Sequence, residues 1–166
     1  RETQLFVTQD GKVVQMQRRF LEGSEVQSLD WIANDMLVRR HLIKSNNHGI
    51  DLYSYYDGSK TWTMTPAEPI LRYGEVGSAW EWRGTVTIGD SHYPARMQYR
   101  IGPLTSATIE GNEVPVTQVL AYGRIGYQNL VREQLFSPRL GLVKEEIVVS
   151  ALGEEKTSVT RLANLR

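Results

Sequence analysis

The sequence predicts an all-β protein: one strongly curved antiparallel sheet that forms an incomplete barrel, a half-barrel. Hydrophobic and polar residues alternate with a period of two along most of the chain, and turn-forming residues separate the alternating runs at short intervals. A chain of 166 residues, 40% hydrophobic and 23% charged, can also bury a substantial core. We therefore expect a single β-rich domain over residues 1–166, with a short helix or loop covering the sheet.

The clearest element is a hairpin between residues 80 and 101. Hydrophobic residues and one glycine fill the even positions of 80–88, and hydrophobic residues fill the odd positions of 93–101. Because successive side chains of a strand point to opposite faces, each run presents one hydrophobic face. Gly89 and Asp90 between the runs are typical of a tight hairpin turn.

Other strands follow from similar signals along the chain. Further alternating runs that we expect as strands are 4–8, 12–20, 36–44, 50–56, 61–64, 113–122, 127–136, 142–151 and 157–162. Asp10-Gly11 marks the first hairpin turn, and residues 123–126 predict a tight turn between two later strands. Short links of this kind join antiparallel neighbours, so about ten to twelve antiparallel strands are expected.

Residues 24–37 fit two structures. Ser24 and Gln27 have the spacing of a helix capping box, and hydrophobic residues follow at helical spacing. The same residues also fit a strand over 25–33 that ends in an Asn34-Asp35 turn. The strand is favoured because the segments on both sides have the pattern of hairpins.

Composition narrows the classes of function. The 19 basic and 19 acidic residues cancel, so the chain lacks the positive charge typical of nucleic-acid binding. Cysteine is absent, which excludes disulfides, thiolate metal sites and cysteine nucleophiles. No hydrophobic run is long enough for a transmembrane segment. We expect no nucleic-acid partner and no cofactor.

The aromatic residues of the 80–101 hairpin are the best candidates for a binding site. Trp80, Trp82, Tyr93 and Tyr99 share one face of the expected hairpin. Such a group could line a strand-walled pocket for an apolar ligand, or it could fill the core, where large rings contribute most. Both alternatives are open at this point, and the four residues are our predicted ligand-binding set.

Other chemistry-bearing residues give weaker signals. His41 and His48 could approach each other across a turn, but a metal ion needs further ligands, so no metal site is expected. No serine-nucleophile motif occurs, and no catalytic residue is assigned. The pair Arg39-Arg40 sends one guanidinium to each face of the sheet, and we expect both at edges or strand ends in solvent.

Three segments resemble a group of bacterial envelope proteins. Residues 69–80 resemble a leucine-containing stretch followed by Val-Gly-x-x-Trp, and residues 136–144 resemble an aromatic-x-Pro-x-x-Gly-Leu-Val-Lys signature. Residues 111–116 lie where such proteins carry a Glu-x-Val-x-Val strand. The group is the domain of unknown function 3108 family with the related LolA- and LolB-like lipoproteins, and the match spans roughly residues 50–165.

This resemblance implies an extracytoplasmic protein of the periplasm or cell envelope, anchored by a lipidated cysteine that would precede Arg1. The leading hypothesis is a non-enzymatic envelope lipoprotein that binds an apolar or lipid-like ligand on its concave face. One alternative is a structural subunit that offers a sheet edge to an envelope protein partner. The other is a small enzyme on the same scaffold.

Overall fold

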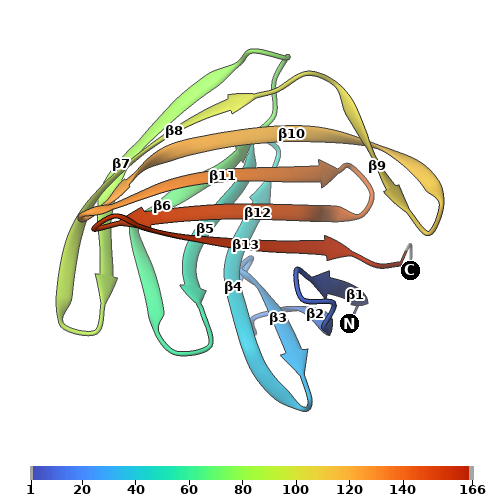
Figure 1. Cartoon of the computed structure of the whole chain (residues 1–166), viewed down its shortest axis with the longest axis horizontal. Helices are drawn as coiled ribbons and strands as arrows, with labels where there is room; N and C mark the ends of the chain where they lie inside the picture. Colours follow the sequence, from blue (N-terminus) through green and yellow to red (C-terminus); the bar gives the residue numbers. More distant parts are fainter. Residues whose placement is uncertain (1, 165–166) are drawn as a thin grey trace.

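Figure 1 shows the computed structural model, which describes residues 2–164. Thirteen β-strands and no helix are found among these residues. The strands are β1 (Glu2–Thr8), β2 (Val13–Phe20), β3 (Gln27–Ala33), β4 (Met36–Asn46), β5 (Gly49–Tyr56), β6 (Thr61–Arg72), β7 (Ala79–Ile88), β8 (Ser91–Ile101), β9 (Thr105–Ile109), β10 (Asn112–Ile125), β11 (Gln128–Ser137), β12 (Gly141–Ala151) and β13 (Glu154–Leu162).

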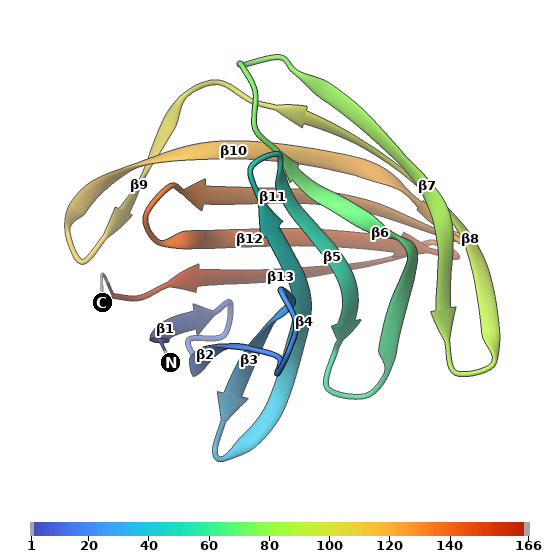
Figure 2. The same cartoon turned by 180° about the vertical axis from the view of Figure 1, so that it is seen from behind.

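Twelve of these strands form a closed antiparallel barrel, so the expected half-barrel is wrong. Consecutive strands pair from β1 to β8 and from β10 to β13, and β8 pairs with β10. The ring closes where Phe6–Thr8 of β1 pair with residues 160–162 of β13 (Figures 1 and 2). This pairing joins the first and last strands of the chain. The sequence pattern could not predict it, because hydrophobic and polar residues alternate within a strand in the same way in an open and in a closed sheet.

β9 lies outside the ring. It pairs with residues 112–116 at the start of β10, while the rest of β10 pairs with β8 and β11. In the strand order β9 is the end strand. Figure 1 shows this hairpin extending beyond the wall formed by β10, β11, β12 and β13, with β4, β5 and β6 crossing behind that wall.

The structure confirms the hairpin at residues 80–101 and the strand over residues 25–33. β7 and β8 pair across the Gly89-Asp90 turn. β3 is followed by Asn34 and Asp35, whose φ angles of 51° and 61° form the two-residue turn into β4. Two successive positive φ values are what a tight hairpin turn requires. The helix alternative for 24–37, and a helix as the cover of the sheet, are therefore wrong.

The expected turn at residues 123–126 is displaced. β10 continues to Ile125, and the turn lies at Gly126 and Tyr127. Gly123 is a strand residue instead, because β8 passes so close that a Cβ atom there would lie 1.9 Å from the carbonyl oxygen of Arg96. The glycine serves close strand approach rather than a turn.

The hydrophobic core occupies the inside of the barrel. Side chains from nearly every strand contribute to it, and the most buried large ones are Phe6, Val86, Met97, Tyr99 and Val119. β8 illustrates the rule, because its odd positions from 95 to 101 are buried whereas its even positions are half-buried or exposed. Side-chain filling of this kind is typical of small barrels.

Candidate ligand-binding cavities

The barrel interior is hollowed toward its two ends. β11 runs between these ends, so its residues mark the position of each hollow. Gln128, its first residue, lines a small pocket, and its last residues, Phe136 and Ser137, line a larger cavity. The side chain of Arg132, between them along β11, is buried and lines neither hollow. The two hollows are therefore separate sites with a filled layer between them.

The larger cavity has a volume of about 430 Å³. Its apolar lining comes from Leu29, Ile43, Ile50, Ile70, Leu71, Phe136 and Leu142. Two arginines, Arg18 and Arg139, also line it, and the described residues of the lining include no aspartate or glutamate. Mostly apolar walls with a few polar groups are the usual construction of a small-molecule site, and this volume lies within the usual range of about 300–1,000 Å³.

Two of the three segments that resemble the lipoprotein families meet at this cavity. The first contributes Ile70, Leu71 and Tyr73, from the end of β6 and the residue after it. The second contributes residues 136–139 and 141–142, where β11 turns into β12. Sequence alone could not bring these segments together, since about sixty positions separate them.

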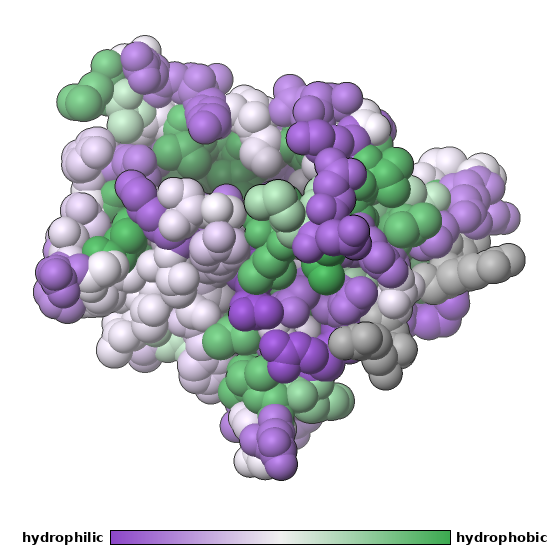
Figure 3. All heavy atoms as spheres, turned by 90° about the horizontal axis from the view of Figure 1, so that it is seen from below, coloured by the Kyte–Doolittle hydropathy of each residue, from purple (hydrophilic) through white to green (hydrophobic). Residues whose placement is uncertain are grey.

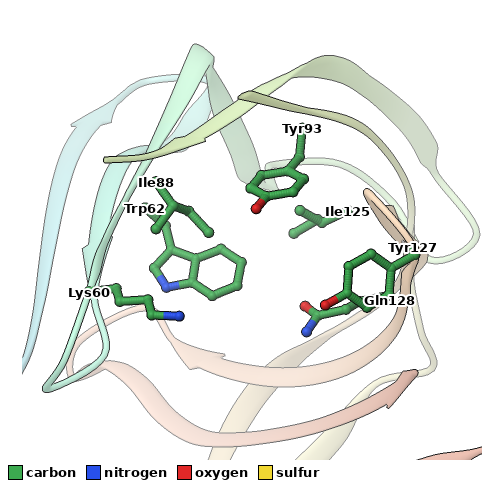
Figure 4. Close-up of a pocket in the computed structure, with 7 residues that line it drawn as sticks. All are labelled: Lys60, Trp62, Ile88, Tyr93, Ile125, Tyr127 and Gln128. Atoms are coloured by element: carbon green, nitrogen blue, oxygen red, sulfur yellow. The ribbon is translucent and has the colours of Figure 1, made fainter. Parts of the chain in front are cut away.

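The small pocket lies at the opposite end and has a volume of about 120 Å³. Figure 4 shows the rings of Trp62, Tyr93 and Tyr127 around it, with the polar ends of Lys60 and Gln128 facing the same space. Ile88 and Ile125 complete its lining. The Trp62 indole N–H donates to Asp57 at 3.0 Å, so this ring is held from outside the pocket.

A layer of buried charge lies in the middle of the barrel. We call Arg39, Glu68, Arg132 and Glu145 the central charged layer. Arg132 of β11 donates to the Glu68 carboxylate of β6 at 2.8 Å, and the Tyr99 hydroxyl donates to the same carboxylate oxygen. Both charged side chains are almost fully buried. This bond therefore ties opposite parts of the barrel wall together across the interior.

The second half of the charged layer borders the larger cavity. Arg39 of β4 donates to Glu145 of β12 at 3.3 Å, and the Gln134 side-chain amide donates to the other carboxylate oxygen at 2.6 Å. Arg39 also lies over the Trp31 ring, 5.5 Å from its centroid. His41 packs between aromatic rings, 4.7 Å from Trp31 by centroid distance. Gln134 and His41 both reach the cavity lining.

Burial and ion pairing set the protonation states of these groups. Burial pushes the pKa of Glu145 upward, but Arg39 and other nearby groups outweigh it and hold the pKa below its usual value. Burial also works against the charge of Arg132, yet Glu68 raises the pKa of that guanidinium. Burial, and then the Glu68 carboxylate, raise the pKa of the Tyr99 hydroxyl, which therefore stays a donor.

His41 is neutral in this environment. Burial lowers its pKa to about 3, against the raising effect of Glu145, and the positive charges of Arg39 and Arg132 lower it further. The ring makes no hydrogen bond to any residue among 2–164, including Glu145. A neutral imidazole offers one donor and one acceptor nitrogen, so His41 gives the cavity an uncharged polar group.

The four predicted binding residues share the inward face of β7 and β8 but differ in surroundings. Trp82 and Tyr99 are buried in the core. Trp80 is half-buried and stacks on Tyr99, with ring centroids 5.2 Å apart and planes 2° apart. Tyr93 lines the small pocket (Figure 4). Ligand binding by these four rings stays a prediction.

Trp80 and Trp82 also close a gap in the sheet. β6 and β7 pair only from Trp62 to Thr65 on β6. Beyond that point the Trp82 indole N–H donates to the Pro66 carbonyl at 3.0 Å, and the Trp80 indole N–H donates to the Pro69 carbonyl at 2.7 Å. The two indoles therefore bond β7 side chains to the β6 backbone where the β6–β7 ladder has ended.

The sequence interpretation missed the charged layer. Arg39 was expected at a solvent-facing edge, whereas it is half-buried and pairs with Glu145. A usable signal was present on β11, where Arg132 and Gln134 share the parity of Leu130 and Phe136. Polar residues inserted into the hydrophobic phase of a strand indicate inward polar groups, which need buried partners. Their partners lie on other strands.

Comparison with solved structures identifies the fold. The crystal structure of the hypothetical lipoprotein YmcC from Escherichia coli K12 matches with a TM-score of 0.57, at 11% identity, over 98% of this chain and 86% of that chain. A candidate lipoprotein from Parabacteroides distasonis matches with a TM-score of 0.43, at 12% identity, over 99% of this chain and 93% of that chain. The likeness to YmcC shows a shared fold.

No protein-family model and no curated protein matches the sequence. The resemblance to the domain of unknown function 3108 and LolA/LolB families therefore gains support only at a coarser level: the fold is one that a hypothetical lipoprotein adopts. Within residues 2–164, no helix has the length and hydrophobicity needed to cross a membrane. The same residues contain no cluster of three or more metal-ligating side chains.

Proposed function

We propose that this protein is a non-enzymatic, extracytoplasmic lipoprotein of the cell envelope that binds an apolar, lipid-like ligand inside its barrel. The observation that carries the proposal is the cavity of about 430 Å³ with apolar walls and two arginines in its lining. The site differs from the one expected from sequence, since it lies at the end of β11 rather than on the β7–β8 hairpin.

The walls of the cavity favour an alkyl or alicyclic ligand. Each CH₂ group that leaves water for such a surface contributes about 0.8 kcal/mol to binding. Leu71 and Phe136 are almost fully buried, so the inner wall is already held in place by the core. A preformed apolar site loses little free energy to ordering when a ligand enters.

The envelope location rests on two supports. The fold is shared with a hypothetical lipoprotein of a bacterium, and two segments that resemble envelope lipoproteins form the cavity wall. A lipid anchor on a cysteine preceding Arg1 would hold the barrel at a membrane surface, where lipid-like ligands are available.

A titration with the fluorescent fatty acid cis-parinaric acid tests ligand binding. We expect a saturable rise in fluorescence for the wild type, because the probe enters an apolar site. Leu142→Trp should weaken binding at least tenfold, since the half-buried Leu142 lines the cavity and a larger ring fills it. Ile88→Trp is the matched control, because the half-buried Ile88 lines the small pocket at the other end. Equal binding by Leu142→Trp and wild type would contradict the proposal.

A sheet-edge function is the second candidate, favoured by β9. This strand is the end strand of the sheet, and the exposed Leu104 precedes it. Edge strands can accept a strand from a partner protein. On the face seen in Figure 3, hydrophobic residues form separate patches between hydrophilic ones rather than one broad apolar surface.

A single cysteine tests this second candidate. The chain contains no cysteine, so Thr105→Cys on exposed β9 introduces a unique thiol for a photoactivatable crosslinker. A discrete crosslinked envelope protein that is absent with Lys156→Cys on exposed β13 would support edge docking. Identical products from both positions would contradict it.

A further inference from the structure

The small pocket presents three aromatic rings and two polar side chains to one space. The rings of Trp62, Tyr93 and Tyr127 surround this space, and the polar ends of Lys60 and Gln128 face it (Figure 4). Its volume of about 120 Å³ lies below the range of roughly 300–1,000 Å³ that is usual for sites enclosing a drug-sized ligand. Lys60 and Tyr127 are exposed, so the pocket reaches the surface beside them. It therefore suits one ring of a ligand whose other parts stay outside.

Two of the three rings are held in place by the fold. The Trp62 indole N–H donates at 3.0 Å to Asp57, which lies between β5 and β6. The Tyr93 ring packs on the backbone of the β10–β11 turn, because a Cβ atom on Gly126 would lie 3.0 Å from ring atom Cδ1. Both rings are half-buried and line the pocket. Fixed rings lose little conformational entropy when a ligand stacks on them.

The charges beside the pocket include both signs. Burial raises the pKa of Asp57, but hydrogen bonds from the Lys60 backbone and the Trp62 indole, and also the charge of Lys60, outweigh it and hold the pKa below its usual value. Asp57 is therefore ionised at neutral pH, and its charge offsets that of Lys60. A neutral ligand with hydrogen-bonding groups suits such a site better than an anion does.

A pyranose ring has the chemistry that these side chains can bind. It carries C–H groups on its faces and hydroxyl groups around its rim. The face of an aromatic ring bears negative charge and attracts the polarised C–H groups of a sugar. A lysine ammonium donates to hydroxyl oxygens, and a glutamine amide both donates to and accepts from hydroxyl groups. An alkyl chain would leave both polar side chains without a partner in the ligand.

We propose that the small pocket binds one pyranose ring of a neutral saccharide. A C–H face of the sugar lies on the Trp62 ring, between Tyr93 and Tyr127, and its hydroxyl groups bind to Lys60 and Gln128. This site lies at the opposite end of the barrel from the larger cavity. The inference goes beyond the proposed function and does not depend on lipid binding in that cavity.

Saturation-transfer difference NMR tests the site on the wild-type protein. The probes are the methyl pyranosides of glucose, galactose, mannose and N-acetylglucosamine. We expect at least one to bind saturably, with a dissociation constant on the order of 1–10 mM and the strongest transfer to its ring C–H protons. Phenol, a ring without the hydroxyl rim, and sorbitol, hydroxyls without a ring, are the comparison compounds. The proposal is overturned if no pyranoside binds, if phenol alone binds, or if sorbitol binds as tightly as the pyranosides.

Two tryptophan substitutions locate the site. Ile88 lines the small pocket, so Ile88→Trp should fill it and weaken pyranoside binding by about tenfold or more. Leu142→Trp, in the larger cavity at the other end, should leave pyranoside binding unchanged. Thermal unfolding of both variants checks that they fold. Equal pyranoside affinity of Ile88→Trp and the wild type would overturn the assignment.

An exposed tyrosine gives a second variant that does not disturb the core. Tyr127 is 60% exposed in the β10–β11 turn, and Tyr127→Ala should weaken pyranoside binding about fivefold, the value of one aromatic contact. Tyr122→Ala is the matched control, because Tyr122 of β10 is similarly exposed and is not among the described lining residues. Unchanged binding by Tyr127→Ala, or an equal loss in both variants, would contradict the proposal.

Discussion

Two regions fill the middle of the barrel in different ways. The aromatic cluster of Trp80, Trp82 and Tyr99 excludes water with large rings: Trp80 stacks on Tyr99, and Trp82 is buried in the core. The central charged layer beside it does so with two ion pairs that span the interior. Tyr99 belongs to both regions, since its ring stacks on Trp80 and its hydroxyl donates to Glu68.

The contrast separates what each region contributes. Rings stabilise the barrel through area removed from water, and a truncated ring leaves a void. A buried ion pair gains little over an apolar pair of the same size, but each member depends on the other because a lone buried charge is very unfavourable. The two regions therefore differ in what a single substitution leaves behind: an unpaired buried charge in the charged layer, and a void in the aromatic cluster. Four measurements test this difference.

The largest effect is expected from removing one charge. Arg132→Ala leaves Glu68 buried without its cation and should lower the free energy of unfolding by about 5 kcal/mol. The double variant Arg132→Met with Glu68→Leu removes both charges and should recover most of this loss. Urea denaturation of both proteins gives the comparison. Equal destabilisation of the single and double variants would show that the pair acts through packing alone.

A slightly smaller effect is expected in the aromatic cluster. Trp82→Ala should lower the free energy of unfolding by about 4 kcal/mol, through the lost ring volume and the hydrogen bond to the Pro66 carbonyl. Trp82→Phe, which keeps most of the ring, should cost about half as much. A Trp82→Ala protein of unchanged thermal stability that no longer binds ligand would instead support the ligand role predicted from sequence.

Acidification should lower the free energy of unfolding through protonation of His41. Its pKa is about 3 in the folded protein, below the ordinary value of 6.5, so the unfolded chain binds a proton first as pH falls. The free energy of unfolding is therefore highest above pH 6.5 and decreases as pH falls toward 3. Between pH 7 and pH 5 this contribution of His41 to the free energy of unfolding falls by about 2 kcal/mol. His41→Phe should reduce this slope of stability against pH, whereas the exposed-site control His48→Gln should keep it.

The smallest effect is expected from an ion pair on the outer face of the β7–β8 hairpin. Arg83 contacts Glu81 on the exposed face of β7, where water screens both charges. Arg83→Ala should change the free energy of unfolding by less than about 1 kcal/mol. A loss as large as that of Arg132→Ala would remove the distinction between buried and exposed pairs on which the comparison depends.

Much of the local structure followed from alternation and turn residues. The β7–β8 hairpin and the Asn34-Asp35 turn were predicted correctly, because strand phase and two-residue turns depend on neighbouring residues. The turn at Gly126 was misplaced by local reasoning, since the role of Gly123 arises from the approach of β8. The candidate site was harder to predict from the sequence. Alternation correctly placed the four aromatic rings on one face, but it could not show whether the space beside them is a filled core or a cavity.

The amino-acid order alone settled that this chain forms antiparallel strands, where most of them turn, and which side chains share a face. Only the three-dimensional pairing decided that β1 meets β13 to close the barrel, that Arg132 meets Glu68, and that β6 and the β11–β12 turn enclose a cavity. The physical reason is the range of the interactions. Period and turn chemistry act within a few residues, whereas closure, buried ion pairs and cavities join positions that are distant in the chain and depend on the whole ring being formed.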